Sequence, residues 1–306
     1  MATKMMESGP FRTLAKTLGT DTSQSAIVGI VSKLLTKCGQ TSAPIELRAV
    51  TEELGINVQW ERVESNGSGV ASLSSHNDKL VVKFYEKSLA NNWRRTRFTV
   101  AHEIIHAAIV KVLADPLLIS ALDGSCDSYK HLERLCDIGA AELLMPKTLF
   151  RQQLHHGPLT SSRLRELYDT FMVSREALLL RVAETLPKGS VTRWRKFSRD
   201  NRESCCFRVV SSYPSYAPTG KSPWLPEGAT SKHVIGFPDH LETLDEGLII
   251  QKRPMRIKLG NKQWEGQGYF TRWPTDRTIQ PAFRGFSVPD EENTRQDSDY
   301  YLVFSE

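Results

Sequence analysis

The stretch RFTVAHEIIHAAI, residues 97–109, constrains the fold of this chain more than any other feature. It contains neither glycine nor proline, and its composition predicts a helix. Apolar residues give that helix a broad surface to bury: Phe98, Val100, Ile104, Ile105, Ile109 and Val110. The same stretch also holds two histidines and a glutamate. Because polar groups are costly to bury without partners, we expect this helix to bind something that pairs with them.

Two histidines four residues apart, with a glutamate directly after the first, form the pattern HExxH. Residues at this spacing lie on one helical face, about 6 Å apart along the axis, so His102 and His106 can bind one metal ion. Zinc accepts neutral imidazole ligands. Glu103 would lie beside a water on that ion and could accept its proton as a general base. The competing interpretation is a solvated glutamate between two unrelated histidines, and the apolar surroundings favour the metal site.

A catalytic zinc site usually has three protein ligands, and we expect the third from another element. The sequence HLERLCDIGAAELLMP, residues 131–146, predicts a second helix. Glu133 is the first candidate, and Asp137 on the same face could orient a ligating histidine. His131 ranks behind Glu133, because an ideal helix rotates the two about 200° apart. Cys136, a softer ligand, ranks last. Alternatively, these charges are solvated groups on an amphipathic helix.

The segments FTVAHEIIHAA and ERLCDIGAAELLMP together resemble the ImmA/IrrE family of metallo-endopeptidases. That family's pattern is FT-x-AHE-x-x-H followed by E-x-x-A-N-x-F-A-A-x-L-L-M-P. The resemblance extends over residues 40–185 and is more specific than HExxH alone. It implies zinc ligation by His102, His106 and Glu133, with Glu103 as the catalytic base. Manganese or iron could replace zinc in vitro.

Three positions depart from the family pattern. Cys136 stands where the family usually has alanine, Asp137 where it often has asparagine, and Gly139 where it usually has phenylalanine. None of these changes removes a ligand or the base. We expect the glycine to loosen the packing beneath the metal.

The remaining pattern predicts an α+β protein with a mainly helical, zincin-like metallopeptidase core, a small β-sheet and a β-rich C-terminal domain. Short runs predict the small sheet at 56–60, 69–74 and 79–85. Later strands are predicted at 205–213, 233–237, 247–252, 255–259, 266–273 and 300–304. We divide the chain into a flexible N-terminal lead (1–22), a metallopeptidase domain (23–155), a helix-turn-helix-like segment (156–190) and a C-terminal regulatory or recognition domain (191–306).

Length, charge and cysteine content limit the class of protein. The chain has 306 residues, a net charge of +5 and five cysteines without a CxxC pair. The mild charge permits contact with nucleic acid but does not indicate it. No run of about eighteen apolar residues predicts a membrane span, and the first residues lack the apolar core of a secretory signal. We therefore expect a cytoplasmic protein that does not bind membranes.

The resemblance implies cleavage of a partner protein, usually a helix-turn-helix transcriptional repressor, which derepresses genes of a mobile element or a stress response. Three residues near the motifs are candidates for stabilising an oxyanion or contacting substrate: Tyr129, His131 and Arg94. The alternative function is a regulator on the same scaffold that binds protein or DNA without cleavage.

Two segments could contact DNA or a repressor. Residues 167–182, LYDTFMVSREALLLRV, resemble the turn and second helix of a helix-turn-helix. We favour the alternative, in which the helical pair packs against the protease core. Residues 188–199, KGSVTRWRKFSR, interleave Trp194 with basic side chains and could contact phosphates or acidic protein. Here we favour a solvated connector with one packed tryptophan. The oligomeric state is not predicted.

Overall fold

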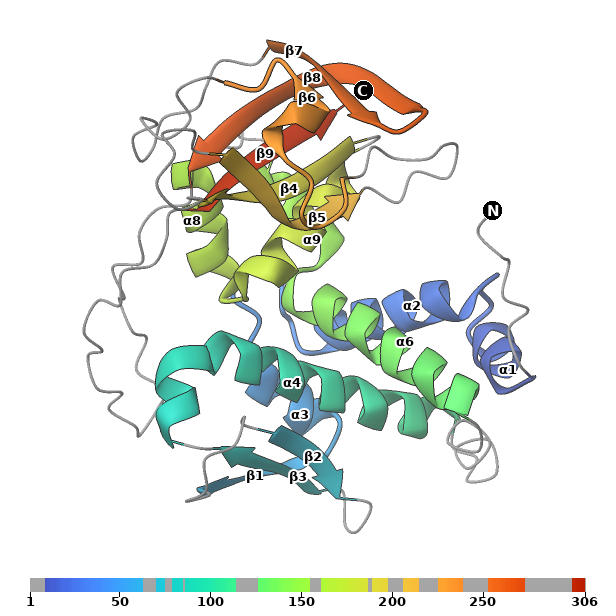
Figure 1. The fold of residues 1–306 in the computed structure, drawn as a ribbon. Helices are drawn as coiled ribbons and strands as arrows, with labels where there is room; N and C mark the ends of the chain where they lie inside the picture. Colours follow the sequence, from blue (N-terminus) through green and yellow to red (C-terminus); the bar gives the residue numbers. More distant parts are fainter. Residues whose placement is uncertain are drawn as a thin grey trace. The chain divides into compact units, whose positions relative to one another are not determined.

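The computed structural model describes residues 9–62, 70–74, 79–84, 86–113, 126–154, 161–186, 189–197, 206–214, 225–238, 253–272 and 299–305. The chain divides into two compact units: a first unit of Met1–Phe150 with Phe171–Ser174, and a second unit of Arg151–Thr170 with Arg175–Glu306. Helices and a small sheet form the first unit, and a larger sheet dominates the second (Figure 1). The predicted α+β layout is therefore confirmed, whereas the four-part division of the chain stays a prediction.

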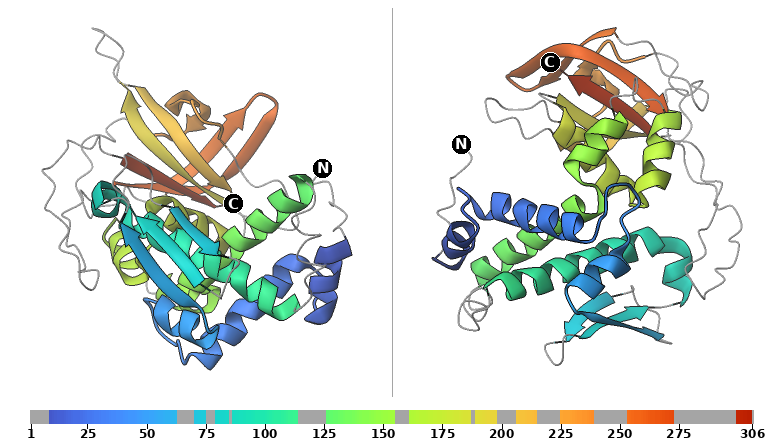
Figure 2. Two further views of the ribbon diagram at one scale, coloured as in Figure 1. Left: turned by 90° about the horizontal axis from the view of Figure 1, so that it is seen from below. Right: turned by 180° about the vertical axis from the view of Figure 1, so that it is seen from behind.

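The first unit is built around one long helix. In chain order its elements are α1 (Gly9–Thr17), α2 (Ser23–Lys37), α3 (Leu47–Glu53), β1 (Asn57–Arg62), β2 (Val70–Ser74), β3 (Lys79–Phe84), α4 (Glu86–Leu113), α6 (Cys126–Leu144) and the start of α7 (Lys147–Leu154), a helix that continues into the second unit from Arg151. The sheet has the order β1-β3-β2, with β1 parallel and β2 antiparallel to β3, and its three predicted strands are confirmed. α4 packs against this sheet and against α6, which in turn packs against α2 (Figures 1 and 2).

Helix α1 overturns part of the expectation that residues 1–22 form a flexible lead. Phe11, Leu14 and Ala15 are all buried, and the helix that carries them packs against α2. The prediction was wrong for Gly9–Thr17, because so short an amphipathic helix is stable only when a neighbour covers its apolar face. That neighbour is not visible in the local sequence.

Gly139 tightens the packing of α6 rather than loosening it, so our expectation for this position was wrong. A Cβ on Gly139 would lie 2.8 Å from the Cγ2 atom of Ile105 on α4 and 2.8 Å from that of Ile27 on α2. Ordinary contacts of a Cβ are 3.4–4 Å long. Both isoleucines are fully buried. The missing side chain therefore lets three helices approach one another closely.

In its described residues the second unit contains the end of α7, the helices α8 and α9, a short 3-10 helix and a six-stranded sheet. Its elements are α8 (Ser161–Phe171), α9 (Arg175–Thr185), β4 (Gly189–Phe197), β5 (Cys206–Pro214), η1 (Ser231–His233), β6 (Val234–Ile235), β7 (Arg253–Leu259), β8 (Lys262–Arg272) and β9 (Asp299–Ser305). The strand order is β5-β4-β9-β8-β7-β6, and every pairing is antiparallel. Predicted strands at 205–213, 255–259, 266–273 and 300–304 are confirmed. The predicted strand at 233–237 shortens to Val234–Ile235, and the one at 247–252 lies outside the described residues.

Over Gly189–Phe197, strand β4 stands where we expected part of a solvated connector, predicted at residues 188–199. It lies between β5 and β9, and Trp194 at its centre is fully buried beside Phe270 and Phe237. The indole nitrogen donates to the hydroxyl of Thr192 at 2.9 Å. The basic run is thus part of a sheet core, and the predicted boundary at residues 190–191 falls inside this strand.

Helix α9 packs against β4 and β5. Our interpretation of the helix-turn-helix-like pair as packing against the metallopeptidase core stays a prediction. Arg181, one of the two basic residues of α9, is 3% exposed and pairs with Glu184 at 3.0 Å. Glu176 pairs with Arg193 of β4 at 3.5 Å. These contacts give α9 a role in covering the sheet. Across the described ranges, no helix is both long and apolar enough to cross a membrane.

Candidate metal centre

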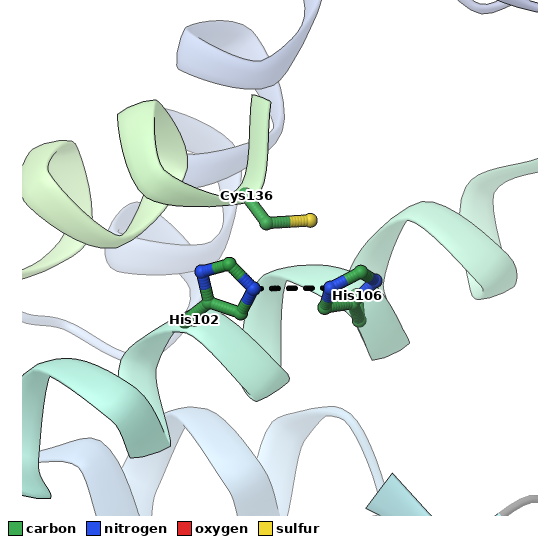
Figure 3. A group of neighbouring side chains, drawn as sticks. All are labelled: His102, His106 and Cys136. Carbon is green, nitrogen blue, oxygen red and sulfur yellow. Dashed lines mark hydrogen bonds between the residues drawn. The ribbon is translucent and has the colours of Figure 1, made fainter. Parts of the chain in front are cut away.

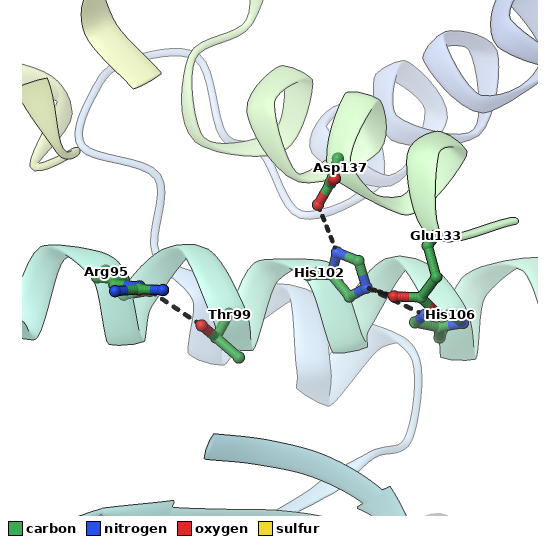
Figure 4. Close-up of polar contacts among 6 residues, drawn as sticks. All are labelled: Arg95, Thr99, His102, His106, Glu133 and Asp137. Atoms are coloured by element: carbon green, nitrogen blue, oxygen red, sulfur yellow. Dashed lines mark hydrogen bonds and ion pairs between the residues drawn. The ribbon is translucent and has the colours of Figure 1, made fainter. Parts of the chain in front are cut away.

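Helix α4 presents the two histidines of the HExxH pattern toward α6. The Nε2 atoms of His102 and His106 are 3.1 Å apart, and their ring centroids are 4.9 Å apart (Figure 4). One turn before His102, the hydroxyl of Thr99 donates to the carbonyl of Arg95 at 3.1 Å, within regular helix. Around the histidines, α4 buries Ala101, Ile104, Ile105 and Ala108. The histidines are thus held on a helix whose orientation is fixed by its core.

Glu133 on α6 faces both imidazoles. One of its carboxylate oxygens lies 3.2 Å from Nε2 of His102, and the other lies 3.1 Å from Nε2 of His106 (Figure 4). The three side chains are partly exposed, at 13%, 20% and 33% respectively for His102, His106 and Glu133. The site is therefore open to water on one side while its walls are apolar.

Asp137, one turn after Glu133, orients His102. Its Oδ1 atom lies 2.9 Å from Nδ1 of His102, and because a carboxylate only accepts, Nδ1 donates this hydrogen bond. Burial lowers the pKa of His102. The bond and charge of Asp137, with the charges of Glu133 and Glu103, outweigh burial and raise that pKa above its ordinary value.

The donor atoms fit a divalent metal ion. With Nδ1 donating to Asp137, the neutral ring of His102 turns the lone pair of Nε2 toward a carboxylate oxygen of Glu133, which also accepts. Two facing acceptors need a proton or a cation between them. Ligand atoms around a tetrahedral ion with bonds of about 2.0–2.1 Å are about 3.3 Å apart. The observed separations of 3.1–3.2 Å match that spacing, so His102, His106 and Glu133 could hold one ion.

Cys136 also lies at this site. Its sulfur and the nitrogens of His102 and His106 are all within 4.8 Å of one another (Figure 3). The carboxylate of Glu133 lies 3.1–3.2 Å from nitrogens of both rings, which is already the spacing of metal ligands, so we place Glu133 first among the candidate ligands of α6. Burial raises the pKa of the Cys136 thiol strongly, and the charges of Glu133 and two other carboxylates raise it further. Without a metal ion the thiol therefore keeps its proton.

The structure places the other predicted site residues as follows. Glu103 is close enough to His102 and Cys136 for its charge to affect the pKa of each. His131 points away toward α1 and α2, where its Nε2 atom lies 3.3 Å from the hydroxyl of Ser23 and its ring meets that of Phe11 edge-on. This placement gives His131 a packing role.

Tyr129 and Arg94 flank the site along the chain. Tyr129 is 50% exposed and lies one helical turn before Glu133. The guanidinium of Arg94 stacks over the ring of Trp93 at 4.3 Å, two turns before His102, or about 12 Å along the helix axis. Their assignment as oxyanion or substrate contacts stays a prediction.

A helix with two histidines one turn apart, faced by a carboxylate of a second helix, defines a candidate metal-binding domain of the HExxH type. Residues 51–183 match the model of the Peptidase M78 family, which is described as the IrrE N-terminal-like domain. The match spans less than half of the chain, and it confirms the resemblance to ImmA/IrrE proteins.

Two curated relatives carry the name Radiation response metalloprotease IrrE. The protein of Deinococcus deserti is 39% identical over 93 residues, which cover 29% of this chain and 32% of the relative. That of Deinococcus radiodurans is 33% identical over 96 residues, which cover 30% of this chain and 28% of the relative. The match thus spans less than a third of either relative. A solved Mycobacterium tuberculosis transcriptional regulator aligns over 97% of this chain and 81% of its own, with 12% identity and a TM-score of 0.46. That likeness is too low to support a common fold.

Proposed function

We propose that this protein is a zinc-dependent endopeptidase with a zincin-like core. The observation that carries the proposal is the convergence of His102, His106 and Glu133 at the spacing of metal ligands, with Glu103 beside them. The domain family and the names of the two Deinococcus relatives support it. Two imidazoles and a carboxylate also suit manganese or iron, so zinc is the first of three candidate ions.

Each residue of the site has a separate role in the proposed hydrolysis of a peptide bond. A bound zinc ion would polarise the scissile carbonyl and lower the pKa of a water. Glu103 would accept the proton of that water and deliver it to the leaving amine. Asp137 keeps His102 in the tautomer whose Nε2 atom is free of hydrogen, which is the form that binds metal. The apolar walls of α4 and α6 exclude water from the side opposite the opening and strengthen these electrostatic interactions.

The substrate that we propose is a helix-turn-helix transcriptional repressor, cleaved in the cytoplasm to derepress mobile-element or stress-response genes. The proposal rests on the resemblance to the ImmA/IrrE family. The second unit would then recognise the substrate or regulate cleavage. It has its own core of aromatic side chains around Trp194 and Phe237, so it could bind a partner without disturbing the metal centre.

The test combines the purified chain with the repressor encoded beside its gene, with zinc or with chelator. We expect cleavage with zinc only, at one bond that mass spectrometry of the products identifies. Glu103→Gln should bind zinc normally but lose cleavage, because an amide does not accept the proton. His102→Ala should lose both. Arg48→Ala, an exposed position, serves as the matched control and should cleave normally.

Two results would count against the proposal. If the zinc-loaded protein binds the repressor and leaves it intact, the chain is a non-cleaving regulator. If Glu103→Gln cleaves at the wild-type rate, another group is the base.

A further inference from the structure

Cys136 is a fully buried thiol that faces the metal centre. Its relative exposure is 0%, and it forms no disulfide. Its sulfur has no hydrogen-bond partner within the described part of the chain. Figure 3 shows the sulfur over the space between the rings of His102 and His106, and all three ligand atoms lie within 4.8 Å of one another. A buried polar atom without a partner therefore points at two metal-binding nitrogens.

The helical position of Cys136 explains why it reaches the site. Glu133, Cys136 and Asp137 stand at positions i, i+3 and i+4 of α6, which lie on one helical face. Glu133 and Asp137 already contact the imidazoles directly. Cys136, which lies between them on that face, approaches the imidazoles from the buried side, whereas Glu133 approaches them from the more exposed side.

We propose that Cys136 is a fourth protein ligand of the metal ion, in addition to His102, His106 and Glu133. The proposal rests on the metal site of the proposed function. In a tetrahedral ion with bonds of about 2.0 Å to nitrogen and 2.3 Å to sulfur, these two atoms are about 3.5 Å apart. Each sulfur–nitrogen distance thus has to shorten by no more than about 1.3 Å for the sulfur to bind. Formation of the metal–sulfur bond releases the thiol proton to solvent, because a coordinated thiol is deprotonated.

Four protein ligands fill a tetrahedral ion and leave no position for water. The resting protein would therefore be a closed form, and cleavage would require Cys136 to leave the ion. Relatives with alanine at this position, the residue that the family pattern usually has, would lack this control. A thiolate also favours zinc and cobalt over manganese, which binds harder oxygen ligands.

The experiment replaces zinc by one equivalent of cobalt in the full-length protein and records its absorption spectrum. We expect visible ligand-field bands together with an intense thiolate-to-cobalt charge-transfer band in the near ultraviolet. Cys136→Ala and Cys136→Ser should keep the visible bands and lose the near-ultraviolet band. Cys38→Ala should keep both, because Cys38 lies elsewhere, with its thiol donating to the carbonyl of Ala49. X-ray absorption of zinc-loaded wild-type protein should show a sulfur neighbour at about 2.3 Å, a measurement that needs no variant.

The outcomes separate this proposal from the proposed function. Cobalt that binds wild-type protein with ligand-field bands alone would overturn Cys136 as a ligand and leave the three-ligand site standing. A charge-transfer band that survives in Cys136→Ala would overturn it as well. If neither wild-type protein nor any variant binds cobalt or zinc, the metal site itself is wrong, and the role of Cys136 fails with it.

Discussion

Replacing Gly139 by alanine should destabilise the first unit, although alanine is the better helix former. The gain in helix propensity is about 1 kcal/mol. Against it, the new Cβ would lie 2.8 Å from methyl carbons of Ile105 and Ile27, and it needs 3.4 Å, so each contact must open by about 0.6 Å. Both isoleucines are fully buried and cannot swing toward solvent. Overpacking of this kind costs about 1–3 kcal/mol, and two fixed neighbours place the cost toward the upper end.

Gly29 provides the matched control for this experiment. It lies within helix α2, and a Cβ there would meet no atom within 4 Å. Gly29→Ala should therefore stabilise the protein by about 1 kcal/mol. Because the propensity gain is common to both variants, the difference between them isolates the steric cost, about 1–3 kcal/mol. The same change from glycine to alanine should thus lower the free energy of unfolding at Gly139 and raise it at Gly29.

The assay is urea unfolding of the full chain, followed by far-ultraviolet circular dichroism in the presence of chelator. Chelator removes the contribution of metal binding to stability. Zinc affinity is then measured separately by competition with a chelating dye, and it should fall in Gly139→Ala, because Ile105 lies between the two histidines on α4. If Gly139→Ala is as stable as Gly29→Ala, the close approach of α6 to its neighbours does not constrain this site, and the reasoning is wrong.

Three further predictions concern the site and the sheet. Glu133→Ala should lose most zinc affinity in a dye competition and His131→Ala little; the reverse order would exchange their roles. Asp137→Asn should bind zinc about 10–100-fold more weakly, since the histidine loses its orienting carboxylate. Asp137 raises the pKa of His102, so in Asp137→Asn this histidine should protonate at lower pH than in wild-type protein. The zinc affinity of the variant should therefore begin to fall at a lower pH. Zinc titrations from about pH 5 to 8 that give the same pH dependence for both proteins would contradict this role of Asp137. Trp194→Ala should destabilise the second unit by about 3–5 kcal/mol in urea unfolding, because Trp194 is fully buried. A loss below about 0.5 kcal/mol would instead indicate that Trp194 lies at the surface.

The features that the sequence predicts well are those set by local spacing. The helix over the HExxH pattern and the three strands of the small sheet follow from periodicity that is complete within each segment. The four-residue spacing of Glu133 and Asp137 predicts that they share one face of the second helix, and the family resemblance implies that this face meets the histidines, as it does in the structure. The spacing patterns themselves lie within a single helix or strand.

The features that the sequence does not predict depend on partners far away along the chain. The arginines beside Trp194 resemble a solvated basic connector until Glu176 of α9 supplies the opposite charge and β9 supplies the hydrogen bonds. In the sequence, Gly139 suggests looser packing, whereas in the structure the side chains of Ile105 and Ile27 fill the space above it. No local pattern carries either fact, since both arise from the packing of separate elements.

The metal centre and the packing of α4 on α6 are parts of one physical arrangement. Glu133 and Asp137 reach the histidines from α6, so the distances of 2.9–3.2 Å depend on how closely the two helices approach. Gly139, half a turn beyond Asp137, permits that approach. The same closeness buries Cys136 against the imidazoles. Because a change in the helix separation alters the distances from Glu133 and Asp137 to the histidines together, we expect the residues that pack these helices to influence metal affinity.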